Sequence, residues 1–419
     1  MKKTRTILLS FVLLLVSSVM AQTLYICRGS DVETASDITF SQNGMVLNGM
    51  IPTADVDSIT TDVPSLRFVG GDISLLPKYE AQGASYKDAG GKAIGDVLAY
   101  LKEQGWNTMR VRLFVDPTKT DDKKSVVQDL DYVAGLGQRI KAAGLLLMLD
   151  FHYSDTWADP SAQWTPDAWK TLSNDELYEK IYQYTKECLE RLCDAGSAPD
   201  FIQTGNEISY GMLWGTKAEA ANNQNNRCFT NSSAANWTRF ITLLKRAGQA
   251  CREVCPRAQI VIHSERVAKP SVMTDFFNRM KAAGVDYDII GLSYYPYFHG
   301  NLSVLDAALT TLEQQHYGKR IQIVEMGYPS QWAVPGTTFD YTATYPYSEA
   351  GQQQFVADLV ALLKKHQQVN GLNWWYAEAN ANGTTGDLKT GWYNASLFNN
   401  NNGRALPALS ELQNYKQGR

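Results

Sequence analysis

The chain has 419 residues, of which 44% are hydrophobic and 20% are charged, as in a folded protein that buries a full core. This length can hold one large α/β domain or two ordinary ones. The net charge of -4, with no basic run longer than a pair after the leader, argues against a nucleic-acid partner and against a polyanionic one.

Residues 1–21 have the pattern of a signal peptide. Two lysines and an arginine open the chain, residues 7–16 are apolar, and Ala21 ends a small-residue cleavage site. The apolar segment is too short to span a membrane and no later stretch qualifies, so we expect no integral membrane segment. We therefore predict export to the extracellular medium, the cell surface or the periplasm. Because Cys27 follows no small-residue lipobox, the sequence gives little support to a lipid anchor.

Six cysteines permit disulfides in an exported chain but do not require them. Cys188 and Cys193 share one predicted helix. Cys251 and Cys255 share another, at a spacing near the limit of disulfide geometry. None of the spacings is typical of a zinc site. We predict that most of the cysteines are buried thiols.

The chain changes character after residue 66. Residues 22–66 hold short alternating segments separated by Asn-Gly and Pro signals, which are typical of hairpins. We predict a small β-rich N-terminal segment there, followed by one large domain over residues 67–419.

In this large domain, short apolar runs alternate with windows that keep apolar residues at helical spacing. Gly105, Gly144, Gly284 and Gly318 stand where helices would end before the next strand. Eight strands with helices between them predict a (β/α)₈ TIM barrel of the α/β class. A doubly wound open sheet is the rival fold, and it is disfavoured because no Gly-x-Gly-x-x-Gly turn follows the first strand. The expected strands are 68–69, 107–115, 145–151, 201–203, 259–263, 289–294, 321–324 and 371–375. The expected helices are 94–101, 126–133, 177–184, 236–254, 272–283, 305–316 and 349–367.

The carboxyl end of every expected strand carries polar or aromatic side chains, whereas the amino ends show no such concentration. In a barrel of this type, the carboxyl ends of the strands meet at the face that holds the active site. We therefore expect a site built from these ends. In chain order they carry Asp72, Arg110 and Arg112, the segment 150–157, Asn206 and Glu207, the segment 263–265, Tyr294 and Tyr295, Glu325, and Trp374 and Trp375.

Two of these residues, Glu207 and Glu325, are carboxylates expected to face one another across the barrel mouth. Glycosidic cleavage needs such a pair, one to protonate the leaving oxygen and one to stabilise or capture the sugar cation. Taken alone, Asn206 and Glu207 are better explained as a helix cap and first turn. Glu325 alone has the alternative of a structural pair with Arg112. The presence of both glutamates at strand ends favours catalysis.

Other hydrolytic chemistries have less support. His152 has no second histidine at a ligand spacing, and the chain has only five histidines, which disfavours a zinc hydrolase. No Gly-x-Ser-x-Gly turn is present for a Ser-His-Asp hydrolase. We expect no metal ligands and no required cofactor.

Seven collinear motifs resemble those of glycoside hydrolase family 53, the endo-β-1,4-galactanases that cut the galactan side chains of pectic arabinogalactan. The resemblance covers about residues 67–415. The motifs are Gly-Gly-Asp-Ile-Ser (70–74), Met-Arg-Val-Arg-Leu-Phe-Val-Asp-Pro (109–117), Leu-Asp-Phe-His-Tyr-Ser-Asp-Thr-Trp-Ala-Asp-Pro (149–160), Thr-Gly-Asn-Glu (204–207), Leu-Ser-Tyr-Tyr-Pro (292–296), Val-Glu-Met-Gly-Tyr (324–328) and Trp-Trp-Tyr (374–376).

The resemblance implies a (β/α)₈ barrel that hydrolyses with retention of configuration, with Glu207 as acid/base and Glu325 as nucleophile. The implied partners are β-1,4-galactan and galacto-oligosaccharides, and we expect a monomer. The cleavage subsite would be lined by His152, by Arg110 or Arg112, and by Tyr294 or Tyr295. The residues expected to bind substrate are Asp72, Arg110, Arg112, His152, Asp155, Trp157, Asn206, Tyr294, Tyr295, Trp374 and Trp375.

Some bacterial proteins of the family that the chain resembles hold a calcium ion in the loops after strands seven and eight. Here these loops, 326–347 and 377–403, are long, and the second has a single acidic residue, Asp387, after Glu378. A calcium site needs several carboxylates. A structural calcium is therefore the less favoured alternative to having no metal.

Four tryptophans, Trp157, Trp164, Trp169 and Trp332, fall in predicted mouth loops. Each is expected either to stack on a sugar or to anchor its loop, with about half in each role. Two further functions stay open. Another retaining barrel endo-glycanase, such as a glucanase or mannanase, would use the same glutamate pair, although the 152–160 loop resembles that of galactanases. A non-catalytic glycan-binding barrel would need neither glutamate.

Overall fold

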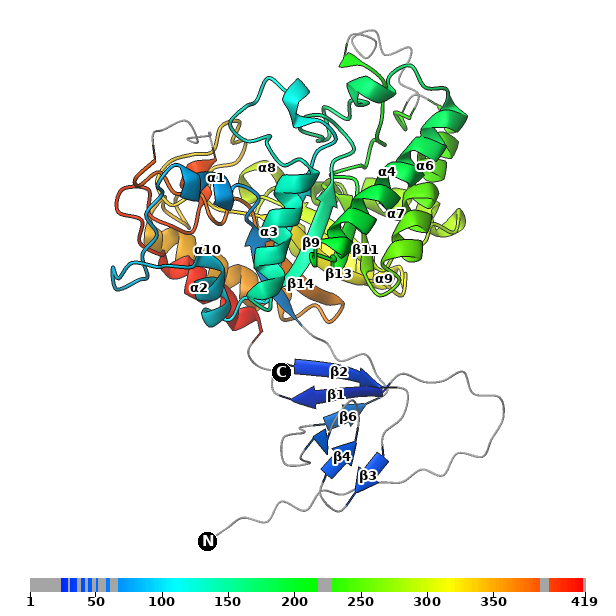
Figure 1. The fold of residues 1–419 in the computed structure, drawn as a ribbon. Helices are drawn as coiled ribbons and strands as arrows, with labels where there is room; N and C mark the ends of the chain where they lie inside the picture. Colours follow the sequence, from blue (N-terminus) through cyan, green and yellow to red (C-terminus); the bar gives the residue numbers. More distant parts are fainter. Residues whose placement is uncertain are drawn as a thin grey trace. The chain divides into compact units, whose positions relative to one another are not determined.

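The computed structural model describes residues 67–217, 228–231, 233–384 and 392–416, together with the backbone strands between residues 24 and 60 (Figure 1). The chain divides into two compact units, residues 1–66 and 67–419. The predicted signal peptide lies outside the described residues.

The first unit contains two antiparallel three-stranded sheets, with the strand orders β2-β1-β6 and β3-β4-β5. In the β1–β2 hairpin, Cys27 pairs with Val32. The strands are β1 (Leu24–Arg28), β2 (Asp31–Ala35), β3 (Thr39–Ser41), β4 (Gly44–Val46), β5 (Met50–Ile51) and β6 (Ser58–Thr60).

Eight parallel strands of the second unit form a closed barrel in the order β10-β11-β12-β13-β14-β7-β8-β9. β14 pairs with β7, which places the last strand beside the first and closes the ring. This confirms the predicted (β/α)₈ fold. The strands are β7 (Phe68–Asp72), β8 (Thr108–Leu113), β9 (Leu146–Phe151), β10 (Phe201–Thr204), β11 (Gln259–Ser264), β12 (Ile289–Tyr294), β13 (Arg320–Met326) and β14 (Val369–Trp374).

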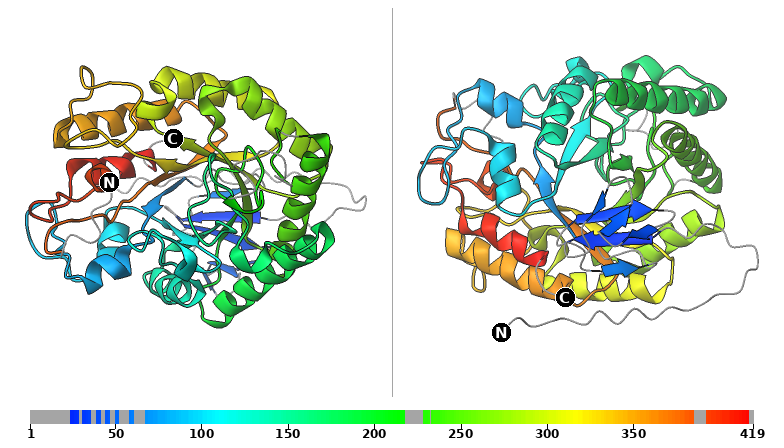
Figure 2. Two further views of the ribbon diagram at one scale, coloured as in Figure 1. Left: turned by 90° about the horizontal axis from the view of Figure 1, so that it is seen from above. Right: turned by 60° about the horizontal axis from the view of Figure 1, so that its bottom comes forward.

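Helices surround the strands on the outside of the barrel (Figure 2). Their starts follow the local sequence: Asp129 caps α3, and Ser173 with Glu176 forms a reciprocal capping box at α4. The four glycines predicted to end helices all have positive φ angles, as a left-handed terminus requires. The helices are α1 (Leu76–Ala81), α2 (Val97–Glu103), α3 (Leu130–Ala142), α4 (Asn174–Asp194), α6 (Ala234–Val254), α7 (Pro270–Ala282), α8 (Pro296–His299), α9 (Leu302–Gln314), α10 (Glu349–Leu363) and α11 (Pro407–Leu412).

The core lies between the barrel and these helices, where apolar side chains of both are fully buried. Barrel closure also depends on a close backbone approach. A Cβ at Gly70 in β7 would lie 1.8 Å from the carbonyl oxygen of Thr108 in β8, so this position requires glycine. Inside the barrel, towards its carboxyl end, the buried side chains are polar, and they include Arg110, Asp150, Gln203 and His263.

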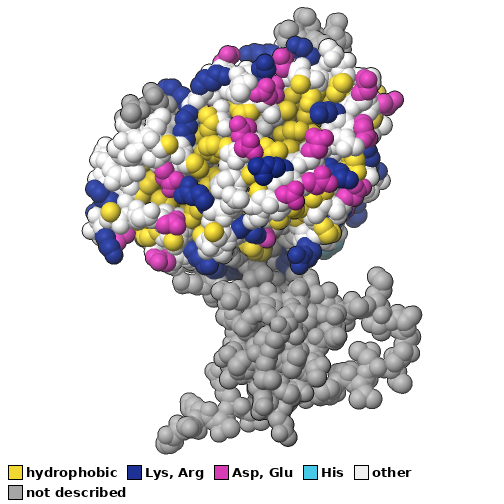
Figure 3. All heavy atoms as spheres, in the orientation of Figure 1, with side chains coloured by type: hydrophobic (Ala, Val, Ile, Leu, Met, Phe, Trp, Pro, Cys, Tyr) yellow, Lys and Arg dark blue, Asp and Glu magenta, His cyan; other side chains and the backbone are white. Residues whose placement is uncertain are grey.

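The surface of the barrel unit carries interspersed acidic and basic side chains on the face shown in Figure 3. Within the described residues, no helix is both long enough and apolar enough to cross a membrane. Four cysteines of the barrel unit, Cys188, Cys193, Cys251 and Cys255, are free thiols, and three of them are buried. The exception is Cys193, whose sulfur lies 3.6 Å from that of Cys255.

Candidate active site

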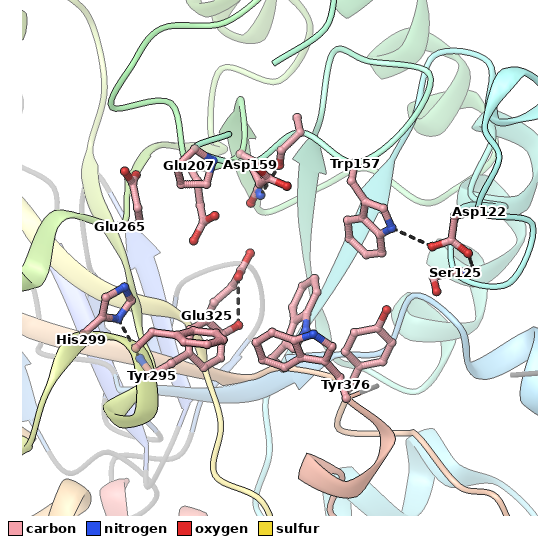
Figure 4. Close-up of a pocket in the computed structure, with 16 residues that line it drawn as sticks. Asp122, Ser125, Trp157, Asp159, Glu207, Glu265, Tyr295, His299, Glu325 and Tyr376 are labelled. Atoms are coloured by element: carbon pink, nitrogen blue, oxygen red, sulfur yellow. Dashed lines mark hydrogen bonds between the residues drawn. The ribbon is translucent and has the colours of Figure 1, made fainter. Parts of the chain in front are cut away.

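A pocket of about 480 Å³ opens at the carboxyl end of the barrel strands. Figure 4 shows the side chains of Glu207 and Glu325 inside it, with Trp157 and Tyr376 on one side of the pair. Both glutamates come from strand ends, Glu325 from β13 and Glu207 from the turn directly after β10. The remaining lining residues are Asp122, Ser125, Trp157, Ala158, Asp159, Pro160, Asn206, Glu265, Tyr295, Phe298, His299, Trp375, Tyr376 and Trp392.

Glu325 has two partners that favour its charged form. Its Oε1 lies 2.8 Å from a guanidinium nitrogen of Arg110, and its Oε2 accepts a 3.0 Å hydrogen bond from the hydroxyl of Tyr295. Burial raises the pKa of Glu325 to about 7, while Arg110 and the Tyr295 hydroxyl act in the opposite direction. The group is thus buried but provided with two contacts that favour its charged form.

Glu207 has a different environment. Burial and the charge of Glu325 raise its pKa well above the ordinary value, and a 2.6 Å hydrogen bond from Ser293 to its Oε1 opposes this only in part. Two carboxyl groups that share a pocket and differ in their partners divide into one acid and one anion. The contacts therefore favour a protonated Glu207 opposite an ionised Glu325.

The backbone at Glu207 is also unusual, since its φ angle of 47° is rare for a residue other than glycine. Its N–H donates to Nδ1 of His263 over 3.2 Å. The opposite nitrogen of that ring lies 2.8 Å from the hydroxyl of Ser293, which in turn donates to Glu207. One histidine thus supports both the backbone and, through the serine, the carboxyl group.

Arg110 connects the elements of the site. Its guanidinium contacts Asp72 at 3.0 Å, Asp150 at 2.8 Å and the side-chain oxygen of Asn206 at 2.9 Å, in addition to Glu325. These residues come from the ends of β7, β9, β10 and β13, and all are buried. These carboxylates and the amide oxygen compensate the guanidinium of Arg110 for the water that it loses on burial. The Asn206 amide then donates to Ala158 over 2.8 Å, which fixes the mouth loop after β9.

Arg112, two residues further along β8, serves another wall of the pocket. Its guanidinium lies 4.7 Å from the ring centre of Trp157 and 4.8 Å from that of Trp375. Asp72 is its nearest carboxylate, at 3.5 Å. Arg112 thus orients aromatic rings that line the pocket. The partner of Glu325 is Arg110, so the alternative of a Glu325–Arg112 pair is wrong.

Several residues expected to bind substrate lie behind the pocket instead. His152 accepts from the backbone of Ala158 and lies 3.0 Å from Asp150. Asp155 accepts from two backbone amides and so joins three loop segments. The hydroxyl of Tyr294 donates to Gly300, and the indole of Trp374 donates to the carbonyl oxygen of Ala395. Arg110, Arg112, Asp72, His152, Asp155, Tyr294 and Trp374 are not among the lining residues.

The pocket also contains residues that were not among those expected to bind substrate. Glu265 follows β11, His299 ends α8, and Tyr376 follows the tryptophan pair. Each of the three follows an expected strand end, and this position in the sequence was the signal that could have indicated a place in the pocket. Asp122 comes from the loop between β8 and α3, and it accepts a 2.9 Å hydrogen bond from the indole of Trp157. Nothing in its local sequence indicated this contact.

The mouth-loop tryptophans differ in their surroundings. Trp157 lines the pocket. Trp169 is buried against Tyr184, and Trp164 packs on Trp214, so both anchor loops. Trp332 is 41% exposed and has the ring of Tyr393 as a neighbour at 5.2 Å.

Among the described residues, no group of three or more His, Cys, Asp or Glu side chains has an arrangement that would hold a metal ion. Asp387, the acidic residue considered for a calcium site, lies outside the described residues. The expectation of no metal stays a prediction.

Comparison with known proteins gives consistent results. The model of glycosyl hydrolase family 53 matches residues 68–412. The chain is 34% identical to a probable arabinogalactan endo-β-1,4-galactanase A from Neosartorya fischeri, over 74% of this chain and 84% of that protein. It is 32% identical to the arabinogalactan endo-β-1,4-galactanase A of Aspergillus niger, over 74% of this chain and 85% of that protein.

Solved structures agree. The family 53 catalytic domain from Ignisphaera aggregans superposes with a TM-score of 0.71 at 34% identity, over 84% of this chain and 96% of that chain. A structure from a study of two fungal β-1,4-galactanases superposes with a TM-score of 0.68 at 29% identity, over 83% of this chain and 98% of that chain. The chain therefore belongs to glycosyl hydrolase family 53.

Proposed function

We propose that the protein is a retaining endo-β-1,4-galactanase that cuts internal bonds of galactan and of arabinogalactan side chains. In this proposal Glu207 is the acid/base and Glu325 the nucleophile. The observation that carries it is the pairing, in one pocket, of a carboxyl group whose environment favours the protonated form with a carboxylate bound by Arg110 and Tyr295.

In the first step, Glu207 gives its proton to the glycosidic oxygen while an oxygen of Glu325 attacks the anomeric carbon. The leaving sugar departs with that proton, and a glycosyl ester forms on Glu325. This ester has no charge, so the part of the rise in the pKa of Glu207 that comes from the charge of Glu325 disappears, while the effect of burial remains. Glu207 can then act as a base and take a proton from water, whose oxygen attacks the same carbon. The bond between that carbon and Glu325 breaks, Glu325 is released as a carboxylate, and the original configuration is restored.

The substrate assignment is supported by the family and by the activity that the similar fungal proteins carry in their names. The pocket is consistent with a sugar polymer, because Trp157, Trp375 and Trp392 present aromatic surface beside the two carboxyl groups. Aromatic faces bind the C–H side of a sugar ring at low entropic cost.

Linear β-1,4-galactan tests the proposal directly. We expect viscosity to fall faster than reducing ends appear, and NMR of the first products to show the β-anomer. Arabinan, mannan and cellulose serve as parallel substrates and should be cleaved far more slowly. Release of galactose alone from the polymer contradicts endo action, and α-anomeric first products contradict retention.

We further propose that no metal takes part in the chemistry, because the two carboxyl groups already fill both catalytic roles. Turnover at low temperature should persist after exhaustive chelation with EDTA. A fall in melting temperature alone would indicate a structural calcium ion in the loops. Immediate loss of turnover that added metal reverses would contradict the proposal.

Export as a monomer is the last part of the proposed function. Amino-terminal sequencing of the secreted protein should begin at Gln22 if the predicted signal peptide is removed after Ala21. Light scattering of the purified protein should give the mass of one chain.

A further inference from the structure

The pocket extends to both sides of the Glu207–Glu325 pair. Figure 4 shows Glu265 and His299 on one side of the pair, and Trp157 on the opposite side. The proposed mechanism uses neither Glu265 nor His299, although both line the pocket.

The two carboxyl groups indicate which sugar each side would hold. The acid must reach the leaving oxygen, whereas the nucleophile must reach the anomeric carbon of the sugar that stays. Glu265 accepts a hydrogen bond from Ser209, two residues after Glu207, whereas Glu325 contacts Arg110 inside the barrel. The side with Glu265 is therefore next to the acid and borders the sugar that leaves.

Glu265 has an unused acceptor at this position. Glu265 is only 7% exposed. Oε1 accepts from the hydroxyl of Ser209 and lies 2.7 Å from Nε of Arg266. Oε2 is buried and has no hydrogen-bond partner among the described residues. A buried carboxylate oxygen without a donor is unfavourable, and a hydroxyl group of a bound sugar would satisfy it.

His299 supplies a donor near this acceptor. Its Nδ1 accepts the backbone N–H of Tyr295 over 3.0 Å, which leaves the ring proton on Nε2 in the neutral form. Burial, with a smaller effect of Arg266, lowers the pKa of His299 to about 4, so the ring is neutral at working pH. In Figure 4 the nitrogen that is not bonded to Tyr295 faces the pocket.

We propose that Glu265 and His299 form the binding site for the leaving sugar, the carboxylate accepting a hydrogen bond from one of its hydroxyl groups and the imidazole donating to another. In a β-1,4-linked galactosyl unit, the hydroxyls nearest the cleaved oxygen are those on C3 and C6, which are available for these contacts. This inference rests on the proposed function and adds two substrate-binding residues to it.

Two substrates separate this site from the catalytic pair. Galactotetraose places a sugar on the leaving side, whereas dinitrophenyl β-galactobioside places a good leaving group there that needs neither acid nor hydroxyl contacts. For Glu265→Ala and His299→Ala, we expect kcat/KM on galactotetraose to fall about 10- to 100-fold, as for loss of a hydrogen bond to a charged or buried partner. On the aryl substrate, the loss should be less than about threefold.

Transfer of the glycosyl group to an acceptor sugar, the reverse of the first step, gives a second measurement at the same site. With dinitrophenyl β-galactobioside as donor and β-1,4-galactobiose as acceptor, the wild type should form galactotetraose in competition with hydrolysis. Both variants should have a lower ratio of transfer to hydrolysis, because the acceptor binds where the leaving sugar was bound.

Asp122→Ala is the matched control, since this residue supports Trp157 on the opposite side of the pocket. It should lower kcat/KM on both substrates by a similar factor and leave the transfer ratio unchanged. Equal losses on both substrates for Glu265→Ala, or no loss on either, would overturn this inference alone. A wild-type protein that cleaves neither substrate would overturn the proposed function as well.

Discussion

At the level of single residues, Glu207 and Glu325 differ in their partners, and this gives each a separate behaviour on mutation. Glu207→Ala should hydrolyse galactan about 10²- to 10⁴-fold more slowly, because the leaving oxygen is no longer protonated. Dinitrophenyl β-galactobioside should still form the glycosyl-enzyme, which should accumulate because no base remains. Added azide should then restore turnover and give the β-galactosyl azide.

Glu325→Ala is the complementary variant and should be inactive on both substrates. With azide it should give at most the α-product. Product analysis by NMR checks both variants, and an exchange of the two rescue patterns would reverse the assigned roles.

The two neighbouring tyrosines give a second prediction at this scale. Tyr295 donates to Glu325, whereas Tyr294 donates to Gly300. The hydroxyl of Tyr295 lowers the pKa of Glu325, so its removal should raise that pKa. The nucleophile then ionises only at higher pH. In Tyr295→Phe, the acidic limb of the kcat/KM profile should therefore move to higher pH.

Tyr294→Phe is the control with the same chemical change. It should keep the wild-type pH profile and lose only about 1 kcal/mol of unfolding free energy from the missing hydrogen bond. Thermal unfolding and pH–rate profiles of both variants provide the comparison. An unshifted acidic limb in Tyr295→Phe would show that the hydroxyl does not control the ionisation of Glu325.

At the level of secondary-structure elements, two glycines of α3 have opposite environments. A Cβ at Gly135 would meet nothing within 4 Å, whereas one at Gly137 would lie 2.7 Å from the Cβ of Ser197 and 3.2 Å from Leu147 on β9. Gly135→Ala should stabilise the protein by about 0.5–1 kcal/mol through helix propensity. Gly137→Ala should destabilise it by roughly 1–3 kcal/mol, because the helix must move away from the strand.

Denaturant unfolding of the two variants measures the difference, and both should cleave galactan at the wild-type rate in native buffer. Equal stability of the two variants would mean that α3 can shift on the barrel without loss of packing.

At the level of the whole molecule, the buried carboxyl group of Glu378 links stability to pH. Its Oε1 accepts the backbone N–H of Leu75 over 2.7 Å. Burial, with the charge of Asp72, raises its pKa from 4.5 to about 8. Between these values the folded protein binds more protons than the unfolded chain, so stability falls as pH rises. This contribution is complete below pH 4.5 and is lost by about pH 8.

We expect the melting temperature of the wild type to decrease from about pH 5 to pH 8, with Glu207 and Glu325 contributing in the same direction. Glu378→Gln keeps an acceptor for Leu75 but cannot ionise. Its melting temperature should change less over this range. An identical pH dependence in both proteins would show that Glu378 does not titrate in this window.

Local sequence patterns are sufficient to predict the barrel and the positions of its two central glutamates. Short apolar runs that end at Thr-Gly or Glu-Met-Gly can be recognised locally, since strand length and helical spacing are properties of neighbouring residues. The carboxyl ends of parallel strands meet at one face, so the sequence pattern alone assigns Glu207 and Glu325 to the same site.

Which residue of each adjacent pair faces the pocket depends instead on long-range contacts. Side chains alternate along a strand, but the phase of that alternation depends on the register of the closed barrel. Near the end of β12 the pairing with β13 shifts register between Leu292 and Ser293. Beyond this shift, Ser293 donates to Glu207 and Tyr295 donates to Glu325, whereas Tyr294 donates to the backbone of Gly300. Likewise, it is closure of the ring that brings Glu325 of β13 to Arg110 of β8, because these strands are not neighbours in the sheet.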